Sequence, residues 1–120
     1  MKVRLKRHPP RLTEAEPKLS PEKEYHVIGI EADDFRIVDD EGDPVLFDAR
    51  LFEIVDPTES DEWMTEFGEA GERYARPAEL QRYIFEDFHD GIPEAVTAVR
   101  KYLRKIGIRT RRAPVARRRG

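Results

Sequence analysis

The side chains of this chain that could do chemistry are its carboxylates and its three histidines, because it has no cysteine. Without cysteine there can be no disulfide, no thiolate zinc site and no cysteine nucleophile. Glu86 and His89 have the Glu-x-x-His spacing that places two side chains on one helix face, but a di-iron site needs two such motifs and further glutamates. His8, His26 and His89 fall in different predicted elements, and no His-Glu-x-x-His sequence suggests a zinc hydrolase.

The densest group of carboxylates is better explained by turns than by a metal ion. Its members are Asp33, Asp34, Asp39, Asp40, Glu41 and Asp43. An EF-hand loop that began at Asp39 would need glycine at its sixth position, where Pro44 stands. Aspartate side chains readily accept hydrogen bonds from nearby backbone N–H groups in turns. We therefore expect no metal and no cofactor.

Other motifs of enzymes are also incomplete in this sequence. Gly68-Glu-Ala-Gly71 lacks the lysine and the spacing of a phosphate-binding loop, and Ser20 and Ser60 lack a nucleophile elbow. The 25 acidic residues allow many carboxylate pairs, so their abundance singles out no acid–base pair. We predict that the protein is not an enzyme and has no catalytic residues.

The elements that must position any binding residues begin near Tyr25. Residues 25–31 are β-branched and aromatic, residues 35–39 alternate apolar with polar, and residues 44–47 and 51–55 are further extended runs. Gly42 stands where a hairpin needs a positive φ. Four strands in about thirty residues suit a meander that curls into a small barrel. The predicted core residues are Phe35, Ile37, Phe47, Phe52 and Ile54.

Three short motifs in this region carry a resemblance. They are Lys23-Glu-Tyr-x-Val27, then Phe35-Arg-Ile37 before the turn Asp40-x-Gly-x-Pro44, and then Leu51-Phe-x-Ile-Val55. Over roughly residues 20–56 the chain resembles the SH3-like small barrels found in uncharacterised bacterial proteins. The resemblance implies a binding scaffold and no activity. The paired tyrosines of a groove for proline-rich peptides cannot be placed.

A second hairpin is predicted over residues 63–76, with its turn at residues 68–71. It could supply a missing strand of the barrel. Trp63 and Tyr74 lie in this hairpin and are candidates for a protein-interaction surface, since exposed aromatic side chains anchor interfaces. The alternative is that they cover the barrel core.

Short helical turns are predicted over residues 77–80 and 83–88, and a clear helix over residues 93–106. Pro93 suits the first turn of this helix, and Gly107 suits its end. Val96, Val99, Leu103 and Ile106 form one apolar stripe, with Ala95 and Tyr102 at its margin. Arg100, Lys101, Arg104 and Lys105 lie off the stripe, near the helix end that favours cations. The fold class is thus mainly β with a C-terminal helix, an α+β arrangement of a small barrel, an added hairpin and a terminal helix.

Charge is strongly segregated along the chain. Residues 1–12 and 100–120 hold fifteen of the 22 lysines and arginines and no acid, whereas residues 13–99 hold seven bases against 25 acids, a balance of −18. We predict a basic and mostly disordered arm over residues 1–20, a single acidic globular domain over residues 21–107, and a basic flexible tail over residues 108–120. The domain comprises the barrel (21–56), the hairpin and helical turns (57–91) and the helix (93–106).

The basic tail has three possible roles. It could bind the phosphates of a nucleic acid or ribonucleoprotein, fold back over the acidic body, or remain solvated without a partner. The candidate nucleic-acid-binding residues are Arg109, Arg111, Arg112, Arg117, Arg118 and Arg119. No aromatic residue lies among them, so base stacking is not expected from the tail.

The leading functional prediction is a non-enzymatic small-barrel binding module whose basic arms contact nucleic acid or a ribonucleoprotein. The alternative is an acidic inhibitor of a basic protein, of the antitoxin or immunity type, since carboxylates complement a cationic site. No apolar run is long enough to span a membrane, and residues 9–13 lack the apolar segment of a signal peptide. We therefore expect a cytoplasmic protein without a membrane partner.

Overall fold

The computed structural model describes residues 1–9 and 18–108, which fall into two compact units. The first unit runs from Met1 to Tyr83, and the second begins at Ile84. Residues 21–107, which the sequence groups into one domain, therefore contribute to both units.

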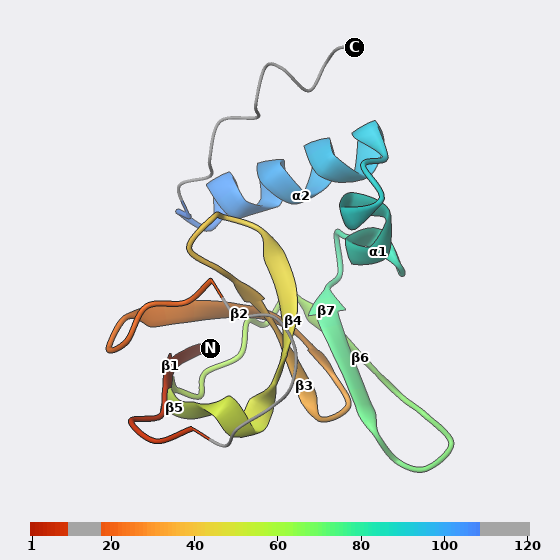
Figure 1. Cartoon of the computed structure of the whole chain (residues 1–120). Coiled ribbons are helices and arrows are strands. Elements are labelled where there is room, and N and C mark those ends of the chain that lie inside the picture. Colours follow the sequence, from red (N-terminus) through yellow and green to blue (C-terminus); the bar gives the residue numbers. More distant parts are fainter. Residues whose placement is uncertain (10–17, 109–120) are drawn as a thin grey trace. The chain divides into compact units, whose positions relative to one another are not determined.

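The first unit is built around a seven-stranded antiparallel sheet (Figure 1). Its strands are β1 (Lys2–Leu5), β2 (Glu24–Glu31), β3 (Asp34–Val38), β4 (Pro44–Asp48), β5 (Phe52–Asp56), β6 (Trp63–Phe67) and β7 (Arg73–Pro77). Five of them follow the order β4-β3-β2-β1-β5, with a short 3₁₀ helix, Ala49–Leu51, before β5. The hairpin of β6 and β7 joins the sheet where β7 pairs with the end of β2.

The second unit contains two helices that pack on each other, α1 (Ile84–His89) and α2 (Pro93–Lys105). The guanidinium of Arg100 lies 5.6 Å from the ring centroid of Phe88, a cation–π contact that links the two helices. The predicted fold class, mainly β with a C-terminal helix, is confirmed. The predicted helix at 93–106 is also confirmed, with Pro93 in its first turn and Gly107 at a φ of 87° after its end.

The turns between the strands form for the reasons that the sequence suggested. Gly42 has a φ of 82°, which only glycine adopts without strain. The carboxylate of Asp39 accepts hydrogen bonds from the backbone N–H groups of Glu41 (2.9 Å) and Asp43 (3.0 Å). The carboxylates of Asp39 and Asp48 thus organise turns, the latter by accepting from the N–H of Arg50 (2.8 Å).

The prediction of an arm over residues 1–20 is wrong for its first residues. Lys2–Leu5 forms β1, which lies between β2 and β5 and pairs with both. Val3 is completely buried in the core of the first unit. The Lys-Val-Arg-Leu sequence alternates basic and apolar side chains with the period of a strand, so burying Val3 leaves the bases at the surface.

The core of the first unit contains a cluster of five buried side chains: Val3, Tyr25, Val27, Ile37 and Phe52. Of the predicted core residues, Ile37 and Phe52 are buried, while Phe35 and Phe47 are partly buried against the cluster. The rings of Phe35 and Phe47 both contact Phe52, with centroids 6.4 and 6.1 Å away.

The prediction that Ile54 belongs to the core is wrong, because this residue is 52% exposed. It pairs with Val3 in register, but β5 is the last strand in the sheet order and only Phe52 at its start is buried. An edge strand can leave an apolar side chain uncovered although its alternation places it on the core side.

The apolar face of α2 is centred slightly differently from the predicted stripe. Val99 and Leu103 are fully buried. Ala95 and Tyr102, which were predicted at the margin of the apolar stripe, are almost fully buried as well. Val96 and Ile106 are only partly buried.

Candidate nucleic-acid interface

The first strand presents a basic face at the surface of the sheet. Arg4 lies between Glu24 of β2 and Glu53 of β5 in the strand register. Its Nε is 2.9 Å from the Oε2 of Glu53, and both side chains are substantially exposed. Such cross-strand ion pairs contribute little free energy in water, but they fix the orientation of the arginine.

Two further bases, Lys6 and Arg7, follow β1 directly. The N–H of Lys6 donates to the carbonyl of Leu51 (2.9 Å), so the pairing with the β5 side continues past the end of the strand. The side chains of Lys6 and Arg7 are exposed, and within residues 1–9 and 18–108 no ion pair is recorded for either. A core strand thus anchors two cations that are available to an outside anion.

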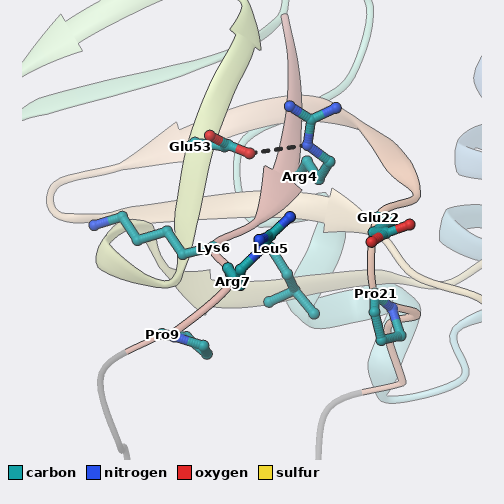
Figure 2. A pocket seen from close by; sticks show the side chains of 8 residues that line it. All are labelled: Arg4, Leu5, Lys6, Arg7, Pro9, Pro21, Glu22 and Glu53. Atoms are coloured by element: carbon teal, nitrogen blue, oxygen red, sulfur yellow. Dashed lines mark hydrogen bonds and ion pairs between the residues drawn. The ribbon is translucent and has the colours of Figure 1, made fainter.

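These bases border a pocket of about 560 Å³, which we call the β1 pocket (Figure 2). It is lined by Arg4, Leu5, Lys6, Arg7, Pro9, Pro21, Glu22 and Glu53. Three cations and two carboxylates give it a small positive balance, and a leucine and two prolines give it apolar walls. Its volume lies within the range of sites that take small organic ligands or parts of larger ones.

One wall of the β1 pocket is a tight turn over residues 20–23. Pro21 occupies its second position, and Glu22, at its third, has a φ of 67°. Proline followed by a positive φ is the pattern of a type II turn, whose third position favours glycine. Glu22 therefore adopts an uncommon conformation for a residue with a Cβ atom, at the rim of the pocket.

The carboxylate of Asp40 holds this turn in place. Asp40 accepts hydrogen bonds from the hydroxyl of Ser20, the ammonium of Lys23 and the phenol of Tyr25, each at 2.8 Å. The N–H of Asp40 donates to the carbonyl of Lys18 (2.9 Å). Because Pro21 and Glu22 lie between Ser20 and Lys23, the turn after β3 fixes one wall of the pocket.

The two carboxylates of the β1 pocket do not neutralise its bases equally. Arg4 is paired with Glu53, whereas Figure 2 shows Lys6 extending to the opposite side of the pocket from Glu22. An anion that approaches Lys6 therefore avoids Glu22 more easily than one that approaches Arg4. Each of these bases can donate hydrogen bonds to a phosphate, and Leu5 and the prolines offer an apolar surface beside them.

The arginines predicted to bind nucleic acid are Arg109, Arg111, Arg112, Arg117, Arg118 and Arg119, and all of them lie outside the described residues. Their role stays a prediction. The β1 pocket was not predicted from the sequence, because residues 1–20 were predicted to form a disordered arm. The alternation of Val3 and Leu5 with Lys2, Arg4 and Lys6 was the signal that could have revealed a strand.

Trp63 and Tyr74 do not form one surface. The strand register places Trp63 opposite Pro77 and Tyr74 opposite Glu66, so the two aromatic side chains lie on different faces of the hairpin. Trp63 is partly buried against this core cluster of the sheet, whereas Tyr74 is 39% exposed. A role in protein interaction stays a prediction for both.

The histidines and carboxylates considered for catalysis are not gathered into a metal site. Within the part of the chain that the structure describes, no group of three or more histidine, aspartate or glutamate side chains could hold a metal ion. His26 lies beside Lys2 in the sheet, where burial and, secondarily, the positive charge of Lys2 lower its pKa. Its imidazole therefore adds no cation to the basic face at neutral pH.

Neither helix within residues 1–9 and 18–108 is long and apolar enough to cross a membrane. Comparison of the chain with protein-family models, with curated proteins and with solved structures gives no match. The resemblance to SH3-like barrels over residues 20–56 stays a prediction.

Proposed function

We propose that the protein is a non-enzymatic, cytoplasmic binding module that contacts the phosphate backbone of a nucleic acid. Lys6 and Arg7 at the β1 pocket bind the phosphates, and the arginines of residues 109–119 add further contacts. The observation that supports this proposal best is the position of Lys6 and Arg7. They follow a strand of the core, border a pocket and are exposed to solvent.

The chemistry of the β1 pocket favours phosphate contacts without base recognition. Arginine can donate two parallel hydrogen bonds to a phosphate, and each neutralised phosphate releases counterions. Among the described residues that line the pocket there is no aromatic side chain on which a base could stack. Binding should therefore depend strongly on salt and little on nucleotide sequence.

The acidic surroundings limit the affinity. Glu22 and Glu53 line the same pocket and repel a phosphate that enters it. Repulsion between exposed charges is screened beyond about 8 Å at physiological salt, so it acts mainly on phosphates close to these two carboxylates.

The test is the affinity of the full chain for a fluorescein-labelled single-stranded oligonucleotide, measured by fluorescence anisotropy at low salt. The double variant Lys6→Ala/Arg7→Ala should bind at least tenfold more weakly than the unmodified chain. The matched control is Arg50→Ala/Arg82→Ala, which also removes two positive charges from the chain. These arginines are already paired with Asp48 (2.9 Å) and Glu66 (2.5 Å).

The control should lose less than threefold, because its bases are neutralised in the fold. Equal losses in the two double variants would show that net charge alone controls binding, and the proposed site would then be wrong. A shortened chain that ends at residue 108 separates the contribution of the tail from that of Lys6 and Arg7.

A second candidate function is the binding of a basic protein by the acidic part of the chain. Glu86, Asp87, Asp90 and Glu94 are all exposed, and residues 84–94 contain no lysine or arginine. Those near the helix starts also complement the helix dipoles, which is a structural role. A salt-sensitive complex with a basic protein that survives in the Lys6→Ala/Arg7→Ala variant, with no oligonucleotide binding by the full chain, would favour this function.

A further inference from the structure

The outer edge of β6 has no partner strand among the described residues. β6 pairs with β7 alone, at the end of the sheet where the hairpin extends away from the other strands of the first unit (Figure 1). Natural edge strands are commonly protected by lysine, proline, a bulge or a covering segment. β6 reads Trp-Met-Thr-Glu-Phe and contains neither lysine nor proline, and its pairing with β7 shows no bulge.

The backbone groups that face outward can be identified from the hairpin. The N–H of Gly68 donates to the carbonyl of Glu72 (2.8 Å) at the closing turn. Because hydrogen-bonded pairs alternate along an antiparallel ladder, the backbone groups of Trp63, Thr65 and Phe67 point away from β7. The N–H of Trp63 donates a hydrogen bond to the carbonyl of Ser60 (3.2 Å). The carbonyl of Trp63, together with the N–H and carbonyl groups of Thr65 and Phe67, can therefore pair with another strand.

The side chains along this edge are self-complementary. Trp63, Thr65 and Phe67 lie on one face, so a second copy paired antiparallel about Thr65 would place each Phe67 beside the Trp63 of the other copy. Phe67 is 70% exposed, the most exposed of the large apolar side chains in the described part of the chain. Aromatic cross-strand pairs stabilise a sheet, and this arrangement forms two of them.

The charges also favour this register. Pairing about Thr65 places Glu66 opposite Met64 of the other copy, so no like charges are directly opposed. Glu66 is already paired with Arg82 (2.5 Å) and lies near Arg76 (3.7 Å). Moving the centre of the pairing from Thr65 to Glu66, a slip of two residues, would place the two Glu66 side chains opposite each other and would remove the aromatic pairs.

We propose that the chain forms a symmetric dimer in which β6 of one copy pairs antiparallel with β6 of another, centred on Thr65. The pairing forms two hydrogen bonds between the Thr65 residues. Two more run from the N–H of Phe67 to the carbonyl of Trp63 of the opposite copy. The contact is isologous, so it closes at two copies and does not propagate into a filament.

The first test is the mass of the full chain in solution, measured by sedimentation equilibrium over a wide concentration range. The proposal predicts a rise from 14.1 kDa to twice that value. Thr65→Pro removes the outward N–H while leaving every backbone hydrogen bond to β7, and it loses only the hydrogen bond that the Thr65 hydroxyl accepts from Arg73 (3.3 Å). This variant should keep a mass of 14.1 kDa even at ten times the concentration at which the unmodified chain dimerises. Phe67→Ser changes only an exposed side chain and should weaken dimerisation at least tenfold.

The matched control is Ile54→Ser, which removes a comparably exposed apolar side chain from another edge strand, β5. It should leave the dimer unchanged. A monomer at every concentration would overturn the proposal, and so would a dimer that Thr65→Pro and Phe67→Ser leave intact while Ile54→Ser disrupts it.

A second experiment tests the register and does not depend on the strength of association. The chain has no cysteine, so Thr65→Cys introduces a single thiol. Directly opposed residues in a hydrogen-bonded pair have Cα atoms about 5.5 Å apart, within the range that a disulfide spans. Thr65→Cys should form a covalent dimer under mild oxidation, whereas the exposed turn variant Glu69→Cys should form at least tenfold less. Equal yields would exclude the proposed register.

Discussion

Asp39 and Asp40 are neighbours in the turn after β3, yet their pKa values shift in opposite directions. Burial raises the pKa of Asp39 and outweighs the two backbone hydrogen bonds that its carboxylate accepts. Burial also acts to raise the pKa of Asp40, but hydrogen bonds from Lys23, Ser20 and Tyr25 outweigh it and lower the pKa. The ionised form is therefore disfavoured by the fold at Asp39 and favoured at Asp40.

We predict opposite effects of the two amide substitutions at pH 7. Asp40→Asn should lower the free energy of unfolding by about 1 kcal/mol, a value reduced by the partial exposure of Asp40. Asp39→Asn keeps an oxygen acceptor for the turn and should leave stability unchanged or slightly higher. Urea denaturation of both variants and the unmodified chain checks this.

The pH dependence follows from the same shifts. A lowered pKa in the folded state contributes stability above the unfolded pKa of about 3.9, and this stability is lost as pH falls through the folded value. The deficit of Asp40→Asn should therefore disappear as the pH falls below about 4. A deficit that stays constant down to pH 2 would mean that the charge of Asp40 is not what holds the turn.

Glu22 combines an uncommon backbone conformation with a negative charge at the rim of the β1 pocket. Glu22→Gly should raise the free energy of unfolding by up to about 1 kcal/mol, because glycine adopts the positive φ without strain. Glu22→Gln removes only the charge and should leave stability unchanged. Both variants should bind an oligonucleotide about twofold more tightly, since each removes one repulsive charge. Thermal denaturation measures the effect of each variant on stability, and fluorescence anisotropy measures its effect on oligonucleotide binding. If Glu22→Gln stabilises the fold as much as Glu22→Gly, relief of backbone strain does not explain the gain in stability.

At the scale of elements, β1 connects the core of the sheet to the basic surface. Val3 is completely buried between β2 and β5, while the bases around it remain at the surface. Val3→Ala should lower the free energy of unfolding by about 2 kcal/mol through lost apolar contact and an unfilled cavity. Chemical denaturation measures this, and a loss below about 0.5 kcal/mol would mean that β1 is not part of the core.

Truncation provides an independent check of the same element. Removal of residues 1–7 should lower the melting temperature sharply, because β2 and β5 lose the strand between them. A chain that ends at residue 108 should melt within a few degrees of the full chain. Similar melting temperatures for both truncations and the full chain would contradict the role of β1.

Much of the element pattern could be predicted from the sequence, because local signals agree with the fold there. The β-branched run at residues 25–31, the glycine of the turn at Gly42 and the proline at Pro93 each determine structure within a few residues. β1 could not be recognised from composition, since its bases and the following prolines resemble those of a disordered arm. Its partners are twenty or more residues away, so the short alternation of bases with Val3 and Leu5 was the only local signal of a strand.

The candidate site was less predictable than the fold for the same reason. The β1 pocket is formed by residues from three separate segments, which are 4–9, 21–22 and Glu53. Sequence reasoning identified the charge of the basic ends but gave no means of bringing these segments together. The exposure of Ile54 depends likewise on the position of β5 at the end of the sheet order.

At the scale of the whole molecule, charge segregation is the basis for the kind of partner that we propose. The bases at the two ends of the chain favour phosphates, and the balance of −18 over residues 13–99 disfavours them. Ion pairs within the fold reduce the acidic excess locally, as between Arg73 and Glu59, whose pKa is lowered mainly by the hydrogen bonds from that arginine. Binding of nucleic acid should therefore depend on a few unpaired bases and not on net charge.

The measurement that tests this account most directly is the salt dependence of oligonucleotide binding by the full chain. For a single strand, the slope of log K against log salt changes by about 0.7 for each phosphate contact. Replacing Lys6 and Arg7 with alanine should reduce the slope by about 1.4, whereas the Arg50→Ala/Arg82→Ala control should leave it unchanged. A slope that is the same in the Lys6→Ala/Arg7→Ala variant and the unmodified chain would contradict the assignment of the β1 pocket as the nucleic-acid site.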